Sequence, residues 1–206
     1  MHKFIKIFLF IGLILFNSTF FCQNNKVDSL KLVLEKSKYD TNRVNTLNAL
    51  SFQSYLQGDF EKEMIYAKKA LGIAKDLKFD TGIINSLNNV GGAYIDFGNY
   101  PEALKYNLES LKIAKKIKNK KWIASAYTMI GIIYGDQGNY PLALQNHYNS
   151  LKISEKIKDL KVVTLCYTNI GNIYFYQKNF PEALDFFLKA LKNQKAIMIS
   201  KVLQVH

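Results

Sequence analysis

The sequence predicts an all-α protein, a solenoid of about four antiparallel helix hairpins. Three observations support this fold class: a fixed repeat step, helical spacing of the apolar residues, and a short polar turn inside each unit. The clearest marker is an aromatic residue that recurs every 40 residues, at Phe60, Tyr100, Tyr140 and Phe180. Such self-similarity indicates a repeat architecture, in which each hairpin buries its apolar face against the next.

The first helix of each pair is predicted from a second recurring segment, which ends at Tyr94, Tyr134 and Tyr174. In the first of these segments, Leu87, Gly91 and Tyr94 are spaced by three or four residues and therefore share one helix face. A glycine inside a helix costs about 1 kcal/mol relative to alanine. Its presence therefore indicates that a neighbouring helix approaches closely.

A turn and a second helix follow. Gly98 is expected to end the first helix in the left-handed conformation that suits glycine. Asn99 is expected to cap the second helix, and Glu102 completes the spacing of a capping box. Pro101 falls in the first turn, where its missing N–H is harmless.

The combined pattern is aliphatic-Gly-x-x-Tyr, then Gly-Asn-Tyr-x-x-Ala-Leu, then small-Leu, and it resembles the tetratricopeptide repeat family over roughly residues 41–192. The usual period of that family is about 34 residues, and the longer step here resembles its long-helix variants, as found in exported bacterial proteins and sensor-kinase input regions. The resemblance implies a right-handed superhelical solenoid, whose first helices line a concave groove that holds peptides in extended form.

The chain is predicted to begin with a secretory signal over residues 1–22, because Lys3 and Lys6 precede an apolar run of about ten residues. We therefore expect an exported protein, periplasmic or extracellular, with no transmembrane helix after signal removal. An uncleaved N-terminal segment that anchors the protein in the membrane is the alternative. Lipidation at Cys22 is disfavoured, because the bulky Phe21 precedes it.

The remaining organisation follows the repeat register. The first repeat is degenerate, with Glu63 in place of an alanine. The predicted units are a capping helix over 23–40, repeats over 41–79, 80–119, 120–159 and 160–199, and the start of an incomplete fifth repeat over 200–206. The apolar end of the chain suggests a fragment of a longer array or an end that a partner covers.

No catalytic, cofactor or metal site is predicted, and the protein is expected not to be an enzyme. His147 and Cys166 align with packing positions of neighbouring repeats, so both are interpreted as structural. No His, Cys and Glu cluster has metal-ligand spacing, and the glycines follow the repeat and do not form a phosphate loop.

Polar residues occupy the other face of each first helix, the face that the resemblance places in the groove. The candidate peptide-binding residues are Asn48, Asn85, Asn88, Asn89, Ser125, Thr128, Thr168, Asn169 and Asn172. By resemblance, Asn89 and Asn169 match asparagines that hold ligand backbones in some members. Asparagine amides both donate to and accept from a peptide backbone. The alternative is a solvated polar face on an asparagine-rich chain.

The net charge of +12 comes from lysines near the ends of the second helices. The sequence disfavours nucleic-acid binding, because Arg43 is the only arginine and no nucleic-acid motif occurs. A weak contact with an anionic surface of the cell envelope is a further alternative. The expected function is thus an exported scaffold that binds a protein or peptide partner through its concave face. The alternative is a truncated extracytoplasmic sensor region of a bacterial histidine kinase or transcriptional regulator.

Overall fold

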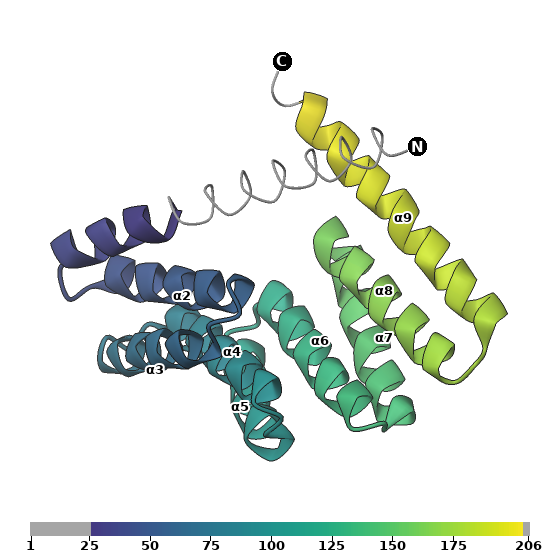
Figure 1. The fold of residues 1–206 in the computed structure, drawn as a ribbon, viewed down its shortest axis with the longest axis horizontal. Helices are drawn as coiled ribbons and strands as arrows, with labels where there is room; N and C mark the ends of the chain where they lie inside the picture. The colour runs from purple at the N-terminus through teal and green to yellow at the C-terminus, as the bar shows by residue number, and fades with distance from the viewer. Residues whose placement is uncertain (1–25, 204–206) are drawn as a thin grey trace, which may run out of the picture.

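The computed structural model describes residues 26–203, which contain helices and turns only. A helix over 26–36 precedes the eight labelled helices (Figure 1). These are α2 (Thr41–Leu56), α3 (Phe60–Asp76), α4 (Asp80–Asp96), α5 (Tyr100–Lys116), α6 (Lys120–Asp136), α7 (Tyr140–Lys156), α8 (Leu160–Tyr176) and α9 (Phe180–Leu203). The predicted signal over 1–22 lies outside the described residues. Among the described helices, none is long and apolar enough to cross a membrane.

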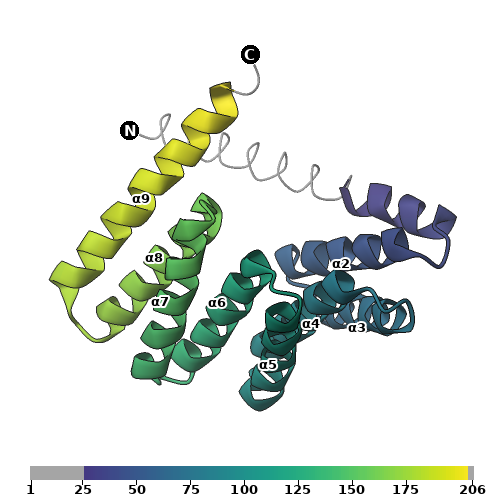
Figure 2. The same ribbon diagram turned by 180° about the vertical axis from the view of Figure 1, so that it is seen from behind.

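The helices form a curved array of four hairpins, with α2 and α3 at one end and α9 at the other (Figures 1 and 2). Each first helix packs on its own second helix and on the first helix of the next hairpin, so that α2, α4, α6 and α8 form a continuous layer. Between the second helices, Lys75 on α3 and Glu109 on α5 form an ion pair at 3.5 Å, but the backbones of the second helices stay farther apart than those of the first helices. The first helices therefore line the inner side of the curve.

Helix ends are set by local hydrogen bonds that the repeat reproduces. The side chain of Asn99 accepts a hydrogen bond from the backbone N–H of Glu102 at 3.3 Å, as an N-cap should. The predicted capping box does not close, however. The backbone N–H of Asn99 donates to the carbonyl of Tyr94, and the carboxylate of Glu102 instead pairs with Lys105 at 3.0 Å.

Every turn between consecutive helices from α2 to α9 contains a residue with positive φ. Inside the hairpins these residues are Gly58, Gly98, Gly138 and Lys178; between the hairpins they are Lys78, Lys118 and Lys158. The prediction for Gly98, with φ of 70°, is confirmed. The left-handed lysines were not predicted, because lysine has no intrinsic preference for this conformation.

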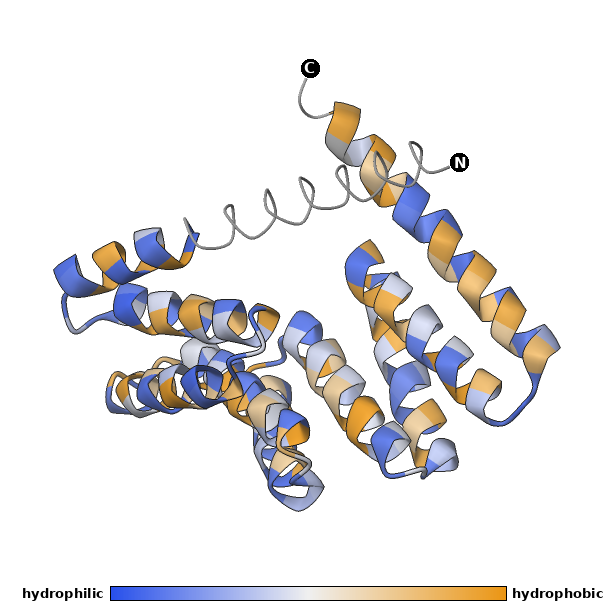
Figure 3. Ribbon diagram, in the orientation of Figure 1, coloured by the Kyte–Doolittle hydropathy of each residue, from blue (hydrophilic) through white to orange (hydrophobic). Residues whose placement is uncertain are grey.

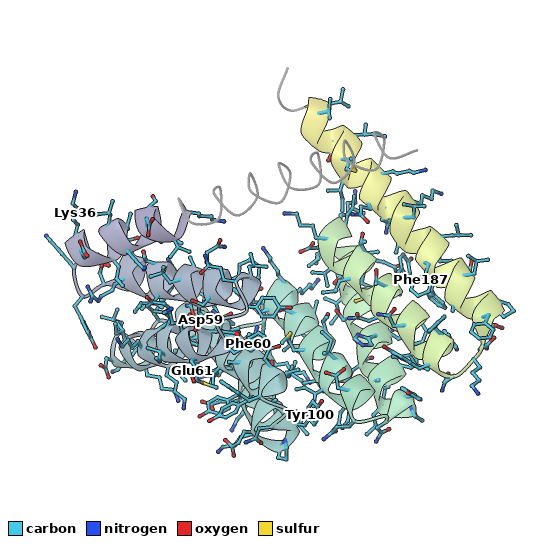
Figure 4. The ribbon with its side chains drawn as sticks, viewed as in Figure 1. Lys36, Asp59, Phe60, Glu61, Tyr100 and Phe187 are labelled. Atoms are coloured by element: carbon cyan, nitrogen blue, oxygen red, sulfur yellow. The ribbon has the colours of Figure 1, made fainter. Side chains whose placement is uncertain are left out.

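The three helical glycines that recur at the same repeat position, Gly91, Gly131 and Gly171, are explained by the helix that packs against them. A Cβ atom added at Gly131 would lie 2.7 Å from His147 Cε1, and one at Gly171 would lie 2.7 Å from Phe187 Cε1, a residue labelled in Figure 4. Gly91 faces the side chain of Asn107 in the same way. Close approach of the second helix, as predicted, is therefore the reason for each glycine.

The C-terminal end differs from the predicted start of a fifth repeat at residue 200. Helix α9 continues without a turn from Phe180 to Leu203. Earlier repeats break at this register, with Phe79, Asn119 or Asp159 at the N-cap, whereas Ile199 lies inside α9. Asn119 and Asp159 accept a capping hydrogen bond that isoleucine cannot accept, although the turn at Phe79 forms without one.

One face of α9 is apolar and uncovered, and apolar residues continue to its end (Figure 3). Leu151 on α7 is 8% exposed because α8 covers it, whereas Leu191 at the same register on α9 is 48% exposed. Among the described residues, no following helix covers this face.

Candidate functional site

The nine predicted binding residues all lie on first helices, but the structure separates them by environment. Asn48, Asn88 and Thr128 are buried between helices. Asn172 is exposed, and the other five, Asn85, Asn89, Ser125, Thr168 and Asn169, are partly buried. The polar face is therefore divided between helix packing and an open inner surface.

Asn48 and Asn89 join α2 to α4. Asn89 Nδ2 donates to Asn48 Oδ1 at 3.1 Å and to its backbone carbonyl at 3.2 Å, and Ser86 Oγ donates to Asn48 Oδ1 at 3.0 Å. Buried polar groups need such partners. In this conformation the hydrogen bonds give both asparagines a structural role. Sequence reasoning missed this role, because predicting it requires the register between two repeats.

Thr128 is part of a buried hydrogen-bonded group between α6, α7 and α8. Its Oγ1 lies 2.7 Å from Ser150 Oγ and donates to the carbonyl of Ala124 at 3.1 Å. Cys166 Sγ lies 3.9 Å from the same Oγ1. Burial raises the pKa of the Cys166 thiol, which disfavours the reactive thiolate. Neither residue faces an open surface.

Asn169 and Asn172 instead meet at a cavity of about 140 Å³ between α6 and α8. The lining residues are Gly131, Ile132, Gly135, Asp136, Tyr140, His147, Asn169, Asn172, Ile173 and Tyr176. We call this space the α6–α8 cavity. Sequence reasoning found its two asparagines but missed Asp136, Tyr140 and Tyr176, because only the structure brings the C-terminal ends of α6 and α8 together.

Two buried polar atoms of the residues that line the α6–α8 cavity have no hydrogen-bond partner within the described chain. They are Nδ1 of His147 and Nδ2 of Asn169. Burial lowers the pKa of His147 to about 4, so the imidazole is neutral at pH 7 and one ring nitrogen can accept a hydrogen bond. Burial raises the pKa of Asp136, which lies at the same cavity.

A second acidic feature lies on the neighbouring hairpins. Glu63 on α3 is 5% exposed, and its carboxylate lies beside α4, where a Cβ at Gly92 would be 3.6 Å from Glu63 Oε1. Burial, the charge of Asp96 and a hydrogen bond with it raise the pKa of Glu63 to about 8. The pair therefore shares a proton at neutral pH. Within residues 26–203, no group of three or more His, Cys, Asp or Glu residues is arranged to hold a metal ion.

Comparison with known proteins identifies a family that this chain matches. A tetratricopeptide repeat model matches residues 82–156 and 122–196, which together make up more than half of the chain. A comparison with curated proteins finds no match.

Three solved structures share the fold. The apo form of RapI is similar with a TM-score of 0.67 and 25% identity, over 81% of this chain and 61% of RapI. A Rap protein complexed with competence and sporulation factor has a TM-score of 0.75 and 20% identity, over 84% of this chain and 50% of that protein. A signal transduction ATPase with numerous domains from Pyrococcus horikoshii, described with a tetratricopeptide repeat sensor, has a TM-score of 0.67 and 19% identity, over 87% of this chain and 28% of that protein.

This chain thus spans less than two thirds of the length of each of these proteins. The predicted fold class, an all-α superhelical solenoid of antiparallel hairpins, is confirmed. Such repeats typically form interaction scaffolds without catalytic function. The repeat step, the hairpin stacking and the model match agree, and the chain belongs to the tetratricopeptide repeat family.

Proposed function

We propose that this chain is an exported, non-catalytic scaffold that holds an extended peptide segment of a protein partner on its inner layer of first helices. The observation that carries the proposal is the α6–α8 cavity, where side-chain atoms of Asn169 and His147 are left without partners. Buried polar atoms without partners cost free energy, which a bound ligand with matching groups recovers. The Rap protein complexed with competence and sporulation factor supports a small ligand on this fold.

The inner layer suits such a ligand in shape as well. The first helices α2, α4, α6 and α8 lie side by side along the curve, so an extended chain can cross several repeats. Asn172 is exposed on this layer and has an amide that can pair with a peptide backbone. The lysines at the turns, including Lys118 and Lys158, could add weak contact with an anionic envelope surface.

The binding proposal is tested with a displayed library of random decapeptides selected on the purified chain. Selected peptides are expected to bind with micromolar dissociation constants and to lose at least about tenfold in affinity when Asn172→Arg places bulk on the inner layer. Lys152→Ala, on an exposed outer position of α7, is the matched control and should change little. Equal losses in both variants, or no selected peptide, would contradict the proposal.

Export is tested separately. Residues 1–25 are fused to a phosphatase that is active only outside the cytoplasm. Activity is expected, and replacing Leu13 and Leu15 with arginine should abolish it, because charges interrupt the apolar run. A retained, inactive fusion would contradict export, and an active fusion that is not cleaved would indicate a membrane anchor.

The second candidate function is the input region of a longer signalling protein. The observation that favours it is the similarity to an ATPase described with a tetratricopeptide repeat sensor, of which this chain spans 28%. The genomic reading frame after the codon for His206 distinguishes the two functions. A membrane span and an output domain encoded there would support the sensor, and a stop codon would support the free scaffold.

A further inference from the structure

The α6–α8 cavity is lined in part by a glycine that packing does not require. Gly135 lies inside α6, and a Cβ atom there would only touch Ala143 Cβ at 3.9 Å, an ordinary contact. The corresponding positions of the other repeats hold Tyr55, Ile95 and Phe175. Gly135 therefore costs helix stability and leaves open space where the other repeats place a large side chain.

Asp136 is the only charged residue among those that line this space. The four ion pairs of the described chain involve Asp59, Glu109, Glu102 and Asp185, so Asp136 has no lysine or arginine partner there. Asp136 is exposed to solvent, and partial desolvation beside the cavity raises the pKa of its carboxyl group.

His147 supplies a second and independent observation. Its side chain is 1% exposed, it lines the cavity, and its Nδ1 atom has no hydrogen-bond partner in the described chain. A neutral imidazole with its proton on Nε2 accepts at Nδ1. The cavity lining thus contains a carboxylate and a buried nitrogen that can each accept a hydrogen bond from an N–H donor.

The other residues that line the cavity also favour a positively charged N–H donor. Tyr140 and Tyr176 contribute aromatic rings, which attract cations. An anionic side chain would meet the uncompensated charge of Asp136. An aliphatic side chain would leave His147 Nδ1 buried without a partner.

We propose that the α6–α8 cavity is a specificity subsite for a positively charged side chain, lysine or arginine, of the bound peptide. Asp136 is its counter-ion, His147 accepts a second N–H, and Asn169 Nδ2 donates to a neighbouring carbonyl of the peptide. This proposal rests on the proposed peptide-binding function. It adds which kind of peptide side chain the protein selects.

The test uses small probes that need no knowledge of the partner: N-acetyl-arginine amide, N-acetyl-lysine amide, and the uncharged isostere N-acetyl-citrulline amide. Binding is followed by NMR through the side-chain amides of Asn169 and Asn172 and the imidazole of His147. The basic probes are expected to bind with millimolar dissociation constants, about tenfold tighter than the citrulline probe. Equal binding of all three would overturn the proposal.

Two variants and a control locate the effect. Asp136→Asn keeps the shape and should remove the preference for the basic probes. Gly135→Ile, which copies Ile95, should fill the cavity and abolish binding while the circular dichroism is unchanged. Asp80→Asn, an exposed carboxylate on α4, is the control and should bind like the parent chain. A preference that survives Asp136→Asn would overturn the proposal.

The two proposals fail in different ways. If selected decapeptides bind the inner layer without enrichment of lysine or arginine, the subsite is wrong and the peptide-binding function stands. If the basic probes bind the cavity but no decapeptide binds, the preference of the cavity for cations stands, whereas peptide binding and the role of the cavity as a peptide subsite are both wrong.

Discussion

At the residue scale, Glu63 shows how one substitution in a repeat creates a titrating site. The other repeats have alanine at this position, at Ala103, Ala143 and Ala183, and all three are buried. A carboxyl group in the same buried place is stable in its protonated form, which Asp96 favours by accepting a hydrogen bond from it. The first repeat therefore carries a titrating carboxyl group where the other repeats have an alanine.

The stability of the array is expected to fall as the pH rises through this titration. The pKa of Glu63 is about 8 in the folded chain, against an ordinary value of 4.5. The folded state binds the proton more tightly, so the stabilising effect is complete below about pH 4.5 and is lost as the pH rises through about 8. Glu63→Gln should remove this dependence and raise the free energy of unfolding at pH 9 by roughly 1–3 kcal/mol.

Urea unfolding at pH 5, 7 and 9 measures the effect. Glu61→Gln, an exposed residue on the same helix, is the control and should keep the pH dependence of the parent chain. If Glu63→Gln shows the same dependence of stability on pH as the parent chain, the assignment of a buried, protonated carboxyl group to Glu63 is wrong.

The glycines of the first helices and the residues that face them form volume-matched pairs. Gly131 faces His147, and the first repeat has Ser51 and Ala67 at the corresponding positions. In this comparison the larger residue on one helix accompanies a smaller one on the other, because a close-packed interior has no room for two large side chains at one contact.

A double-mutant cycle tests this pairing. Gly131→Ser alone should destabilise the chain by roughly 1–3 kcal/mol through overpacking against the imidazole. Combined with His147→Ala, which copies the first repeat, the same change should cost clearly less, with an interaction energy of at least about 1 kcal/mol. Denaturant midpoints with equal m-values provide the measurement, and strictly additive effects would contradict the pairing.

At the element scale, each second helix depends on the first helix that follows it. Leu151 on α7 is covered by α8, and Leu191 on α9 is half exposed at the same register. The same side chain therefore contributes differently in two repeats.

Truncation of these leucines should show the difference. Leu151→Ala is expected to lower the free energy of unfolding by about 2–4 kcal/mol, and Leu191→Ala by less than about 1 kcal/mol. Chemical denaturation of both variants compares an internal and a terminal position with the same chemistry. Equal losses would mean that α9 is covered in solution, for instance by a second copy, which sedimentation would detect.

At the scale of the whole molecule, the array is quasi-one-dimensional, because every contact between helices joins the same or the next hairpin. Local stability should therefore fall toward an end that no neighbour covers. In hydrogen exchange, backbone amides of α9 beyond Lys192 are expected to exchange at least about tenfold faster than those of α6 and α7. Uniform protection along α9 would contradict this expectation.

The sequence by itself determined the repeat, the helix hairpins, the turn glycines and the N-caps, since these depend on local spacing and backbone conformation. It also predicted Asn169 and Asn172 as candidate binding residues. Only the tertiary structure decided that Asn48 and Asn89 bond to each other, and that Asp136 and His147 meet at one cavity. The first relation depends on the superhelical register between hairpins, which brings together residues 41 positions apart. The second depends on how α7 packs against α6 within one hairpin, and no local pattern encodes either.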